Sequence, residues 1–165
     1  MWTGPSIRWQ DRIEEPLSGV LFLERVRVFC LDKIIKSTGR GSMILGIGTD
    51  IVEIDRVKKA VAKEAFVKRV FTEAEVAYCR GRGAGMAESF AGRFAAKEAV
   101  LKAFGTGLRE GRMLDIEIVN DELGCPRLKL HGAFDKLAGG MGVSRTWLSI
   151  SHAREYATAQ CVLES

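Results

Sequence analysis

The sequence predicts an α+β domain in which a small, mostly antiparallel sheet packs against one long helix. Three observations support this fold: a short apolar strand that begins at Met43, an unbroken helical pattern over residues 86–104, and an apolar hairpin near the end of the chain. Strand and helix patterns alternate between them, which is typical of mixed layers of sheet and helix. The chain has 165 residues, enough for one such domain to bury a sizeable core without disulfides or a structural metal.

The first part of this domain reads as a strand, helices and a glycine-rich break. The expected elements are a strand over residues 43–51, helices over 53–63 and from 72 to about 80, a break over 82–85 and the long helix over 86–104. Thr72 and Glu75 form a capping-box signature, which places a helix start there. The core-facing stripe of the long helix consists of Phe90, Phe94, Leu101 and Phe104. Gly105 and Gly107 end that helix.

The second part reads as two hairpins around a short helix. Residues 114–119 alternate apolar and charged side chains, as a half-buried strand does. The remaining expected elements are a turn over residues 120–124, a returning strand over 127–130, a helix over 133–138, and strands over 147–151 and 157–163 joined around residues 152–155. Strands joined by short turns pair antiparallel, which makes the sheet mostly antiparallel.

Residues 1–42 differ in pattern from the rest of the chain. We expect an N-terminal extension and linker that is irregular or partly helical, followed by the folded domain over residues 43–165. An amphipathic stretch over residues 21–36 can form a short helix, and the charges within it argue against a signal peptide. Residues 37–42, with the sequence STGRGS, read as a flexible linker, so Met43 is a candidate biological start.

Composition and charge narrow the function class without fixing it. Hydrophobic residues make up 47% and charged residues 28%, which excludes a mostly disordered chain, and no run of about 18 apolar residues could span a membrane. The 25 basic and 21 acidic residues give a net charge of +4. A mildly basic protein favours an anionic partner, and nucleic acid, a phosphorylated small molecule and an acidic protein are all candidates.

The four cysteines lie far apart in the sequence. They are Cys30, Cys79, Cys125 and Cys161, so they form neither a CxxC pair nor a zinc-type cluster. Free thiols in a reducing compartment are the simplest interpretation, which favours a cytoplasmic location.

Four charged residues lie within three turns of the long helix. Arg93 and Lys97 are four residues apart, and so are Glu98 and Lys102, which predicts that they stack on neighbouring parts of one face. A solvated face with ordinary ion pairs is one interpretation. The large apolar residues and alanines around the four, and the glycine turn that follows, favour a functional cluster instead.

Asp50 stands near the end of the first strand, beside two glycines. A carboxylate with little side-chain bulk around it suits a hard cation that also carries phosphate oxygens, and Mg²⁺ is typically held in this way. Asp50 and Glu98 are therefore candidate metal ligands. The alternative is that Asp50 serves as the N-cap of the following helix. A dinucleotide-binding GxGxxG fingerprint would need glycine where Ile51 stands, which argues against that motif.

Three motifs follow one another along the chain: GIGTDIVEI over residues 46–54, FAGRFAAKEAVLKAFGTG over residues 90–107, and SISH over residues 149–152. In order and spacing they resemble holo-acyl-carrier-protein synthase, the small bacterial type of the 4'-phosphopantetheinyl transferase family. The resemblance covers roughly residues 43–164. It implies the fold of that family and transfer of 4'-phosphopantetheine from coenzyme A to a serine of apo-acyl carrier protein. It also implies release of adenosine 3',5'-bisphosphate, a requirement for Mg²⁺ and a role in fatty acid biosynthesis.

The resemblance also assigns roles by position. Asp50 and Glu98 correspond to the metal ligands and Lys102 to the lysine near the pyrophosphate, so these three are the candidate catalytic residues. The positions that line the coenzyme A site correspond to Arg93, Lys102, Gly105, Gly107 and His152. The basic positions that dock the acidic carrier protein correspond to Arg56 and Arg69. The serine proton would pass to Glu98 or to a metal-bound water that Glu98 orients, and the sequence leaves both open.

Two other function classes compete with the transferase. A small basic RNA-binding module would fit the charge, but the obvious phenylalanines lie on a helical core stripe, where they cannot form a stacking platform. A purely structural subunit would leave the acidic pair without a purpose. We therefore expect no nucleic-acid or membrane partner, and the resemblance implies a homotrimer with active sites between subunits.

Overall fold

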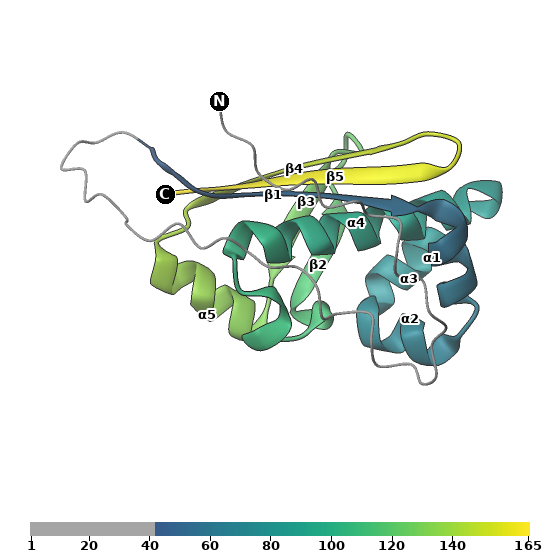
Figure 1. Ribbon diagram of the computed structural model, residues 1–165, viewed down its shortest axis with the longest axis horizontal. Coiled ribbons are helices and arrows are strands. Elements are labelled where there is room, and N and C mark those ends of the chain that lie inside the picture. The colour runs from purple at the N-terminus through teal and green to yellow at the C-terminus, as the bar shows by residue number, and fades with distance from the viewer. Residues whose placement is uncertain (1–41) are drawn as a thin grey trace, which may run out of the picture.

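The computed structural model describes residues 42–165, so the helix expected over residues 21–36 lies outside the described residues. Five strands and five α-helices follow one another in the described part (Figure 1). The strands are β1 (Ile44–Glu53), β2 (Ile116–Asn120), β3 (Pro126–Leu130), β4 (Arg145–His152) and β5 (Tyr156–Glu164). The helices are α1 (Ile54–Val61), α2 (Glu64–Val70), α3 (Glu73–Arg80), α4 (Met86–Phe104) and α5 (Gly132–Met141), with single 3₁₀ turns at Gly83–Gly85, Gly107–Arg109 and Met113–Asp115.

Local sequence signals account for most of the helix boundaries. Thr72 and Glu75 form the predicted capping box at the start of α3, in which each side chain accepts from the backbone N–H of the other. The long helix α4 has the predicted bounds and ends at Gly105, whose φ of 73° is left-handed. The seven-residue helix α2 was not predicted, because Lys63 at its N-cap provides no side-chain cap and so short a helix depends on packing.

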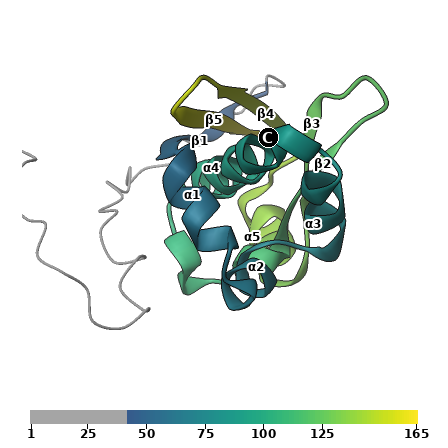
Figure 2. The ribbon, with the colours of Figure 1, turned by 90° about the vertical axis from the view of Figure 1, so that its right-hand side faces the viewer.

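The strands form two sheets instead of the one that the sequence indicates. β1, β5 and β4 lie side by side in that order, and β2 pairs with β3 in a separate hairpin. All these pairs within residues 42–165 are antiparallel. Figure 2 looks nearly along α4, with the three-stranded sheet on one side of this helix and α2, α3, α5 and the β2–β3 hairpin around the others. The long helix is therefore the centre of the fold.

The strand β1 lies very close to α4. A Cβ atom on Gly46 would stand 2.1 Å from the Ala103 carbonyl oxygen, and one on Gly48 would stand 1.9 Å from the Ala99 carbonyl oxygen. Both neighbours are backbone atoms of a packed helix, so only glycine fits at these two positions. Side chains alternate along a strand, which turns Asp50 to the same side as the glycines. The glycines thereby bring Asp50 close to α4.

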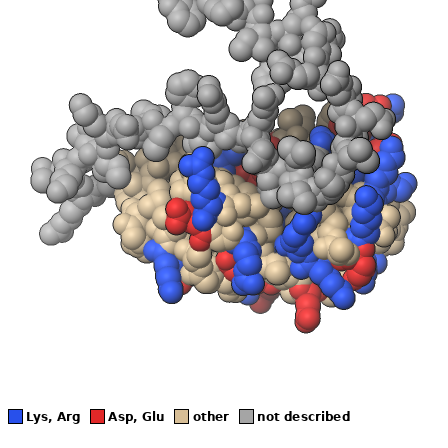
Figure 3. Space-filling model, turned by 60° about the horizontal axis from the view of Figure 1, so that its bottom comes forward, with Lys and Arg blue, Asp and Glu red and all other residues tan. Residues whose placement is uncertain are grey.

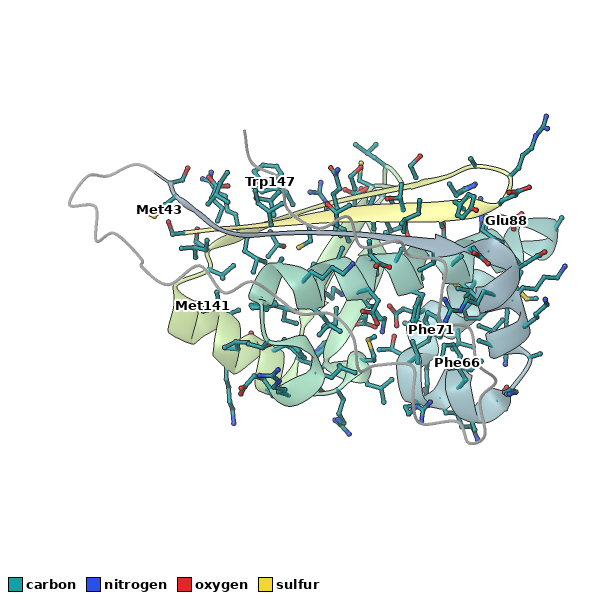
Figure 4. All side chains as sticks on the ribbon, viewed as in Figure 1. Met43, Phe66, Phe71, Glu88, Met141 and Trp147 are labelled. Atoms are coloured by element: carbon teal, nitrogen blue, oxygen red, sulfur yellow. The ribbon has the colours of Figure 1, made fainter. Side chains whose placement is uncertain are left out.

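The predicted apolar stripe forms the core around α4. Its four residues, Phe90, Phe94, Leu101 and Phe104, are all buried. Phe71 packs edge-on against Phe90 with ring centroids 5.0 Å apart. Phe66 lies beside Phe71 on the helical side of the molecule (Figure 4). The phenylalanines of the stripe are therefore core residues, which removes them from any base-stacking surface.

Two expectations about the chain as a whole can be compared with the described residues. Cys79, Cys125 and Cys161 are free thiols, as predicted, and Cys30 lies outside the described part. Within residues 42–165, none of the helices has the length and apolar character needed to cross a membrane.

Candidate active site

Asp50 lies on β1 with its side chain toward α4. The Lys102 ammonium donates to Asp50 Oδ1 at 2.8 Å and to the Thr49 carbonyl oxygen at 2.9 Å. From β5, the Thr158 hydroxyl donates to the Asp50 carbonyl oxygen at 2.8 Å and so fixes the backbone here. The second carboxylate oxygen, Oδ2, is buried and has no hydrogen-bond partner among the described residues. Because buried polar atoms are normally paired, this oxygen is suited to bind a ligand.

Glu98 stands one helical turn before Lys102 and brings a second carboxylate near Asp50. Burial and then the charge of Asp50 raise the pKa of Glu98 to about 7, against the opposing effect of the Lys102 ammonium. Burial also raises the pKa of Asp50 above its ordinary value, although the hydrogen bond and charge of Lys102 oppose this. Two carboxyl groups whose charged forms are disfavoured in this way indicate a place for a cation.

The pair fits a divalent cation that prefers oxygen ligands. The unpartnered Oδ2 of Asp50 and the raised pKa of both carboxyl groups are expected of a site in which the one ammonium of Lys102 does not offset two carboxylates. Nowhere in residues 42–165 do three or more His, Cys, Asp or Glu side chains gather in a way that could hold a metal. Mg²⁺ suits such a partial site, because it takes one or two carboxylates and completes its shell with substrate phosphates and water. The N-cap of α1 is Glu53, so the alternative role for Asp50 as that cap is wrong.

The four clustered charged residues of α4, Arg93, Lys97, Glu98 and Lys102, do not share one face, so that prediction is wrong. Five residues separate Arg93 from Glu98, which turns their side chains about 140° apart around the helix axis. Glu98 and Lys102 lie on the side of β1. Arg93 and Lys97 lie on the side of α3, where Lys97 pairs with Glu75 Oε2 at 2.7 Å. A spacing of four residues places Arg93 and Lys97 on one face, and Glu98 and Lys102 on one face. It does not show whether the two pairs share the same face.

The sequence does not predict the ion pair between Glu75 and Lys97. Neither side chain has any exposed surface. Lys97 Nζ also donates to the backbone carbonyl oxygens of Val70 (2.7 Å) and Met113 (3.0 Å). The Glu75 carboxylate accepts from the backbone N–H groups of Thr72 (2.8 Å) and Ile118 (2.9 Å). The pair therefore joins α2, α3, α4 and β2. The capping box identifies Glu75 as a helix-start residue but gives no sign that its charge is buried.

The residues predicted to line the coenzyme A site lie in separate places within one chain. Arg93 faces α3, His152 is exposed at the end of β4, and Gly105 and Gly107 follow α4. His152 and Asp50 are on the two outer strands of the β1–β5–β4 sheet, and a strand spacing of about 4.8 Å keeps their backbones at least ~9 Å apart. Of the predicted catalytic and coenzyme-binding residues, the structure brings three together, namely Asp50, Glu98 and Lys102.

The two predicted docking residues lie on neighbouring helices. Arg56 on α1 and Arg69 on α2 are both exposed. A mostly apolar cavity of about 260 Å³ opens beside Arg69. Its lining consists of Phe66, Arg69, Val70, Phe94, Leu108, Gly111, Arg112, Met113 and Leu114. Figure 3 shows Lys and Arg side chains spread over the face that α2 and α5 share, with uncharged surface and several Asp and Glu side chains between them. This face combines positive charge with an apolar hollow.

Similarity to known proteins assigns this arrangement to a family. Residues 46–161 match the family described as the 4'-phosphopantetheinyl transferase superfamily. The chain belongs to this superfamily. The matched region contains Asp50, Glu98 and Lys102 as well as the helix α4 that carries two of them. The predicted family is therefore confirmed, and the protein is a transferase of this superfamily.

Three members of the 4'-phosphopantetheinyl transferase superfamily show how much of the chain is shared. A holo-[acyl-carrier-protein] synthase of Geobacter sulfurreducens is 50% identical over 125 residues, which are 74% of this chain and 98% of the relative. The crystal structure of the synthase from Neisseria meningitidis has a TM-score of 0.69 at 37% identity and covers 74% of this chain and 100% of its own. The structure of the Bacillus anthracis synthase in complex with CoA (3',5'-ADP) has a TM-score of 0.63 at 44% identity. The match covers 74% of this chain and 98% of that structure's chain. These structures confirm the α+β fold class.

Proposed function

We propose that this transferase moves the 4'-phosphopantetheine group from coenzyme A to a serine of apo-acyl carrier protein, as a holo-[acyl-carrier-protein] synthase. The observation that carries the proposal is the cluster of Asp50, Glu98 and Lys102, inside a region that is 50% identical to such a synthase. The second product is adenosine 3',5'-bisphosphate, and the holo-carrier protein serves fatty acid biosynthesis. The free thiols of the described cysteines support a cytoplasmic location.

The reaction depends mainly on the neutralisation of negative charge. The serine oxygen attacks the β-phosphorus of coenzyme A, and the bond from that phosphorus to the oxygen of the leaving bisphosphate breaks. Asp50 and Glu98 would hold Mg²⁺, which supplies positive charge for the pyrophosphate oxygens when it is bound. The Lys102 ammonium is oriented by Asp50 and the Thr49 carbonyl oxygen. From there it offsets the charge of the leaving phosphate or donates a proton to it.

Glu98 is the candidate general base, because it is the carboxylate of α4 beside Asp50. Without a bound cation, burial and the charge of Asp50 raise its pKa to about 7, and a Mg²⁺ ion held by the pair would lower it again. The serine proton passes to Glu98 itself or to a water that Glu98 orients. His152 lies across the sheet from Asp50, so we assign it to a phosphate or ribose contact of coenzyme A.

A mass measurement tests the proposed function. The full chain is incubated with coenzyme A, Mg²⁺ and an apo-acyl carrier protein, and the carrier protein is then weighed by mass spectrometry. We expect it to gain the mass of one phosphopantetheine group, and to gain nothing when Mg²⁺ is omitted. An unchanged carrier mass, together with RNA binding that is sensitive to salt and indifferent to Mg²⁺, would instead identify an RNA-binding module.

We further propose that three chains assemble through the outer face of the β1–β5–β4 sheet. Five large apolar side chains of these strands are exposed: Ile44 (60%), Ile47 (63%), Ile51 (65%), Trp147 (53%) and Tyr156 (45%). Figure 4 shows Trp147 on the side of the sheet away from α4. A group of apolar side chains on one sheet face supports a subunit interface. A site shared between subunits would also account for the distance of Arg93 and His152 from Asp50 within one chain.

Replacing Ile47 with Glu is expected to convert the trimer into single chains, because a charge at the centre of an apolar interface is costly to bury. Sedimentation should give three times the mass of one chain for the wild type and one chain mass for the variant. The matched control is Leu123→Glu in the β2–β3 turn, where the side chain is 91% exposed and off this face. A wild-type chain that sediments as a monomer, or an Ile47→Glu variant that stays trimeric, contradicts the interface.

We assign carrier-protein docking to Arg56 and Arg69, with the cavity beside Arg69 as its apolar centre. Carrier proteins of this kind are acidic, so a basic surface attracts them. Arg56→Glu should raise the KM for the carrier protein about fivefold, which corresponds to about 1 kcal/mol, and leave the KM for coenzyme A unchanged. Salt should weaken carrier binding by the wild type more than by the variant, because the attraction is screened over about 8 Å at physiological ionic strength.

Steady-state kinetics with each substrate varied in turn, at two ionic strengths, measures both effects. Lys129→Glu on β3 makes the same change of charge at an exposed position away from α1 and α2 and serves as the control. An unaltered carrier KM in Arg56→Glu, or a defect confined to coenzyme A, would remove this surface as the docking site.

We propose that residues 43–165 carry the whole activity. The match to 74% of this chain covers 98% of the Geobacter sulfurreducens synthase, and the family match lies within residues 46–161. A chain that begins at Met43 should therefore assemble and transfer phosphopantetheine as the full chain does. Turnover and sedimentation of the two chains give the comparison. A large loss of activity or of soluble protein would show that residues 1–42 are an integral part of the enzyme.

A further inference from the structure

Arg93 is a buried cation without a carboxylate partner. The residue is only 6% exposed. Within residues 42–165 it forms no ion pair with Asp or Glu, and its Nε atom is buried without a hydrogen-bond partner there. Buried charges in proteins are normally paired, because desolvation of an isolated charge is costly. The missing negative charge therefore points to a bound anion.

The groups around Arg93 do not provide the missing charge. Glu75 is already paired with Lys97. Burial raises the pKa of the Cys79 thiol to about 11, although the charge of Arg93 opposes this, so the thiol stays neutral. Arg82 adds a second cation, with its Cζ 5.7 Å from the centroid of the same Tyr78 ring that covers Arg93. The surroundings therefore carry excess positive charge.

Two neutral side chains hold the Arg93 guanidinium. Its Cζ lies 3.9 Å from the centroid of the Tyr78 ring on α3, a cation–π contact. Its Nη2 donates to Asn120 Oδ1 at 2.5 Å at the end of β2. Asn120 is itself oriented, because its Nδ2 donates to the Gly124 carbonyl oxygen at 2.7 Å. Both contacts fix the position of the cation without neutralising it.

We propose that Tyr78 and Asn120 are positioning residues that hold Arg93 ready for a phosphate group of coenzyme A. The inference rests on the proposed function, in which coenzyme A is the donor substrate. Tyr78 is 38% exposed and Arg82 is exposed, so the buried guanidinium lies against side chains that reach the surface. An acidic residue at either holding position would pair with Arg93 and cancel the charge offered to the phosphate. An apolar residue would leave the guanidinium free to turn away.

Three variants of the full chain test the two positions. Tyr78→Leu removes the ring face and should raise the KM for coenzyme A about tenfold. A change of this size can result from the loss of one desolvated cation–π contact. The kcat and the KM for the carrier protein should not change. Tyr78→Phe keeps the ring and should restore the wild-type KM. Asn120→Asp should raise the KM for coenzyme A at least as much, while its melting temperature stays equal to or above that of the wild type.

The Asn120→Asp variant separates positioning from a structural role. A carboxylate there strengthens the contact with Arg93, so a merely structural role predicts unchanged binding of coenzyme A. Calorimetry with adenosine 3',5'-bisphosphate measures the affinity without any transfer reaction, and its Kd should rise by the same factor as the KM. Wild-type affinity in Asn120→Asp or Tyr78→Leu overturns the inference. Tight binding of the bisphosphate without transfer to a carrier protein would contradict the proposed function alone.

Discussion

Replacing Glu98 with Gln is expected to lower kcat at least about a hundredfold, the lower end of what a positioned general base contributes. The substitution keeps the size of the side chain but removes the negative charge that binds a cation and accepts the serine proton. Asp50→Asn should cause a loss of similar size, because it removes the other charge of the pair. The measurement is transfer to the carrier protein at saturating substrates, repeated over a range of Mg²⁺ concentrations.

Two controls accompany this experiment: the variants must fold, and the same substitution at an exposed position must leave turnover unchanged. Circular dichroism should show that both variants fold, and their unfolding free energies should equal or exceed that of the wild type, since burial disfavours both charges. Glu73→Gln makes the same chemical change at an exposed position in the first turn of α3 and should keep full turnover. Near wild-type turnover of Asp50→Asn or Glu98→Gln at limiting Mg²⁺ would show that the assigned roles are wrong.

The sequence was sufficient for the parts of the fold that depend on local patterns. The long helix has an apolar stripe and a glycine stop, and both of its predicted ends are correct. The capping box of α3 is equally local. The helix α2 has only seven residues and no side-chain cap, so its formation depends on packing that no local pattern records. The division of the strands into two sheets likewise depends on contacts between distant segments.

The candidate site divides in the same way. The family motifs grouped Asp50 with Glu98 and Lys102. In the structure these three side chains lie together, because Gly46 and Gly48 allow β1 to approach α4. The spacing of the charges did not predict that Arg93 and Lys97 are buried on another face of the helix. From spacing alone, charged residues in a helix are interpreted either as a solvated face or as one cluster. The two residues are buried because α3 packs against them, with Glu75 paired to Lys97 and the Tyr78 ring over Arg93. These contacts depend on tertiary packing. Residues that act through such partners cannot be found from spacing.

The buried pair of Glu75 and Lys97 allows a second prediction of large effect, on stability. Lys97→Met is expected to lower the free energy of unfolding by about 3–5 kcal/mol, because it leaves the Glu75 carboxylate buried without its counter-charge. Methionine is similar in length to lysine, so little of the loss would come from an empty space. Two backbone carbonyl oxygens, of Val70 and Met113, also lose their donor. Urea unfolding followed by circular dichroism gives the free energy, and Lys136→Met at an exposed position on α5 should change it by less than about 0.5 kcal/mol.

A double variant shows whether the uncompensated charge is the cause of this loss. Glu75→Gln removes the charge but keeps an oxygen that can accept from the backbone N–H of Ile118, as Glu75 Oε1 does at 2.9 Å. If the lone carboxylate is responsible, Glu75→Gln combined with Lys97→Met should be more stable than Lys97→Met alone, and the double-mutant cycle should give a favourable coupling between the two positions. If the free energy of unfolding of Lys97→Met lies within about 1 kcal/mol of the wild-type value, the loss is no larger than that expected for an exposed ion pair. That result would mean that water or a shifted side chain compensates Glu75, and that the pair does not hold α3 and β2 against α4.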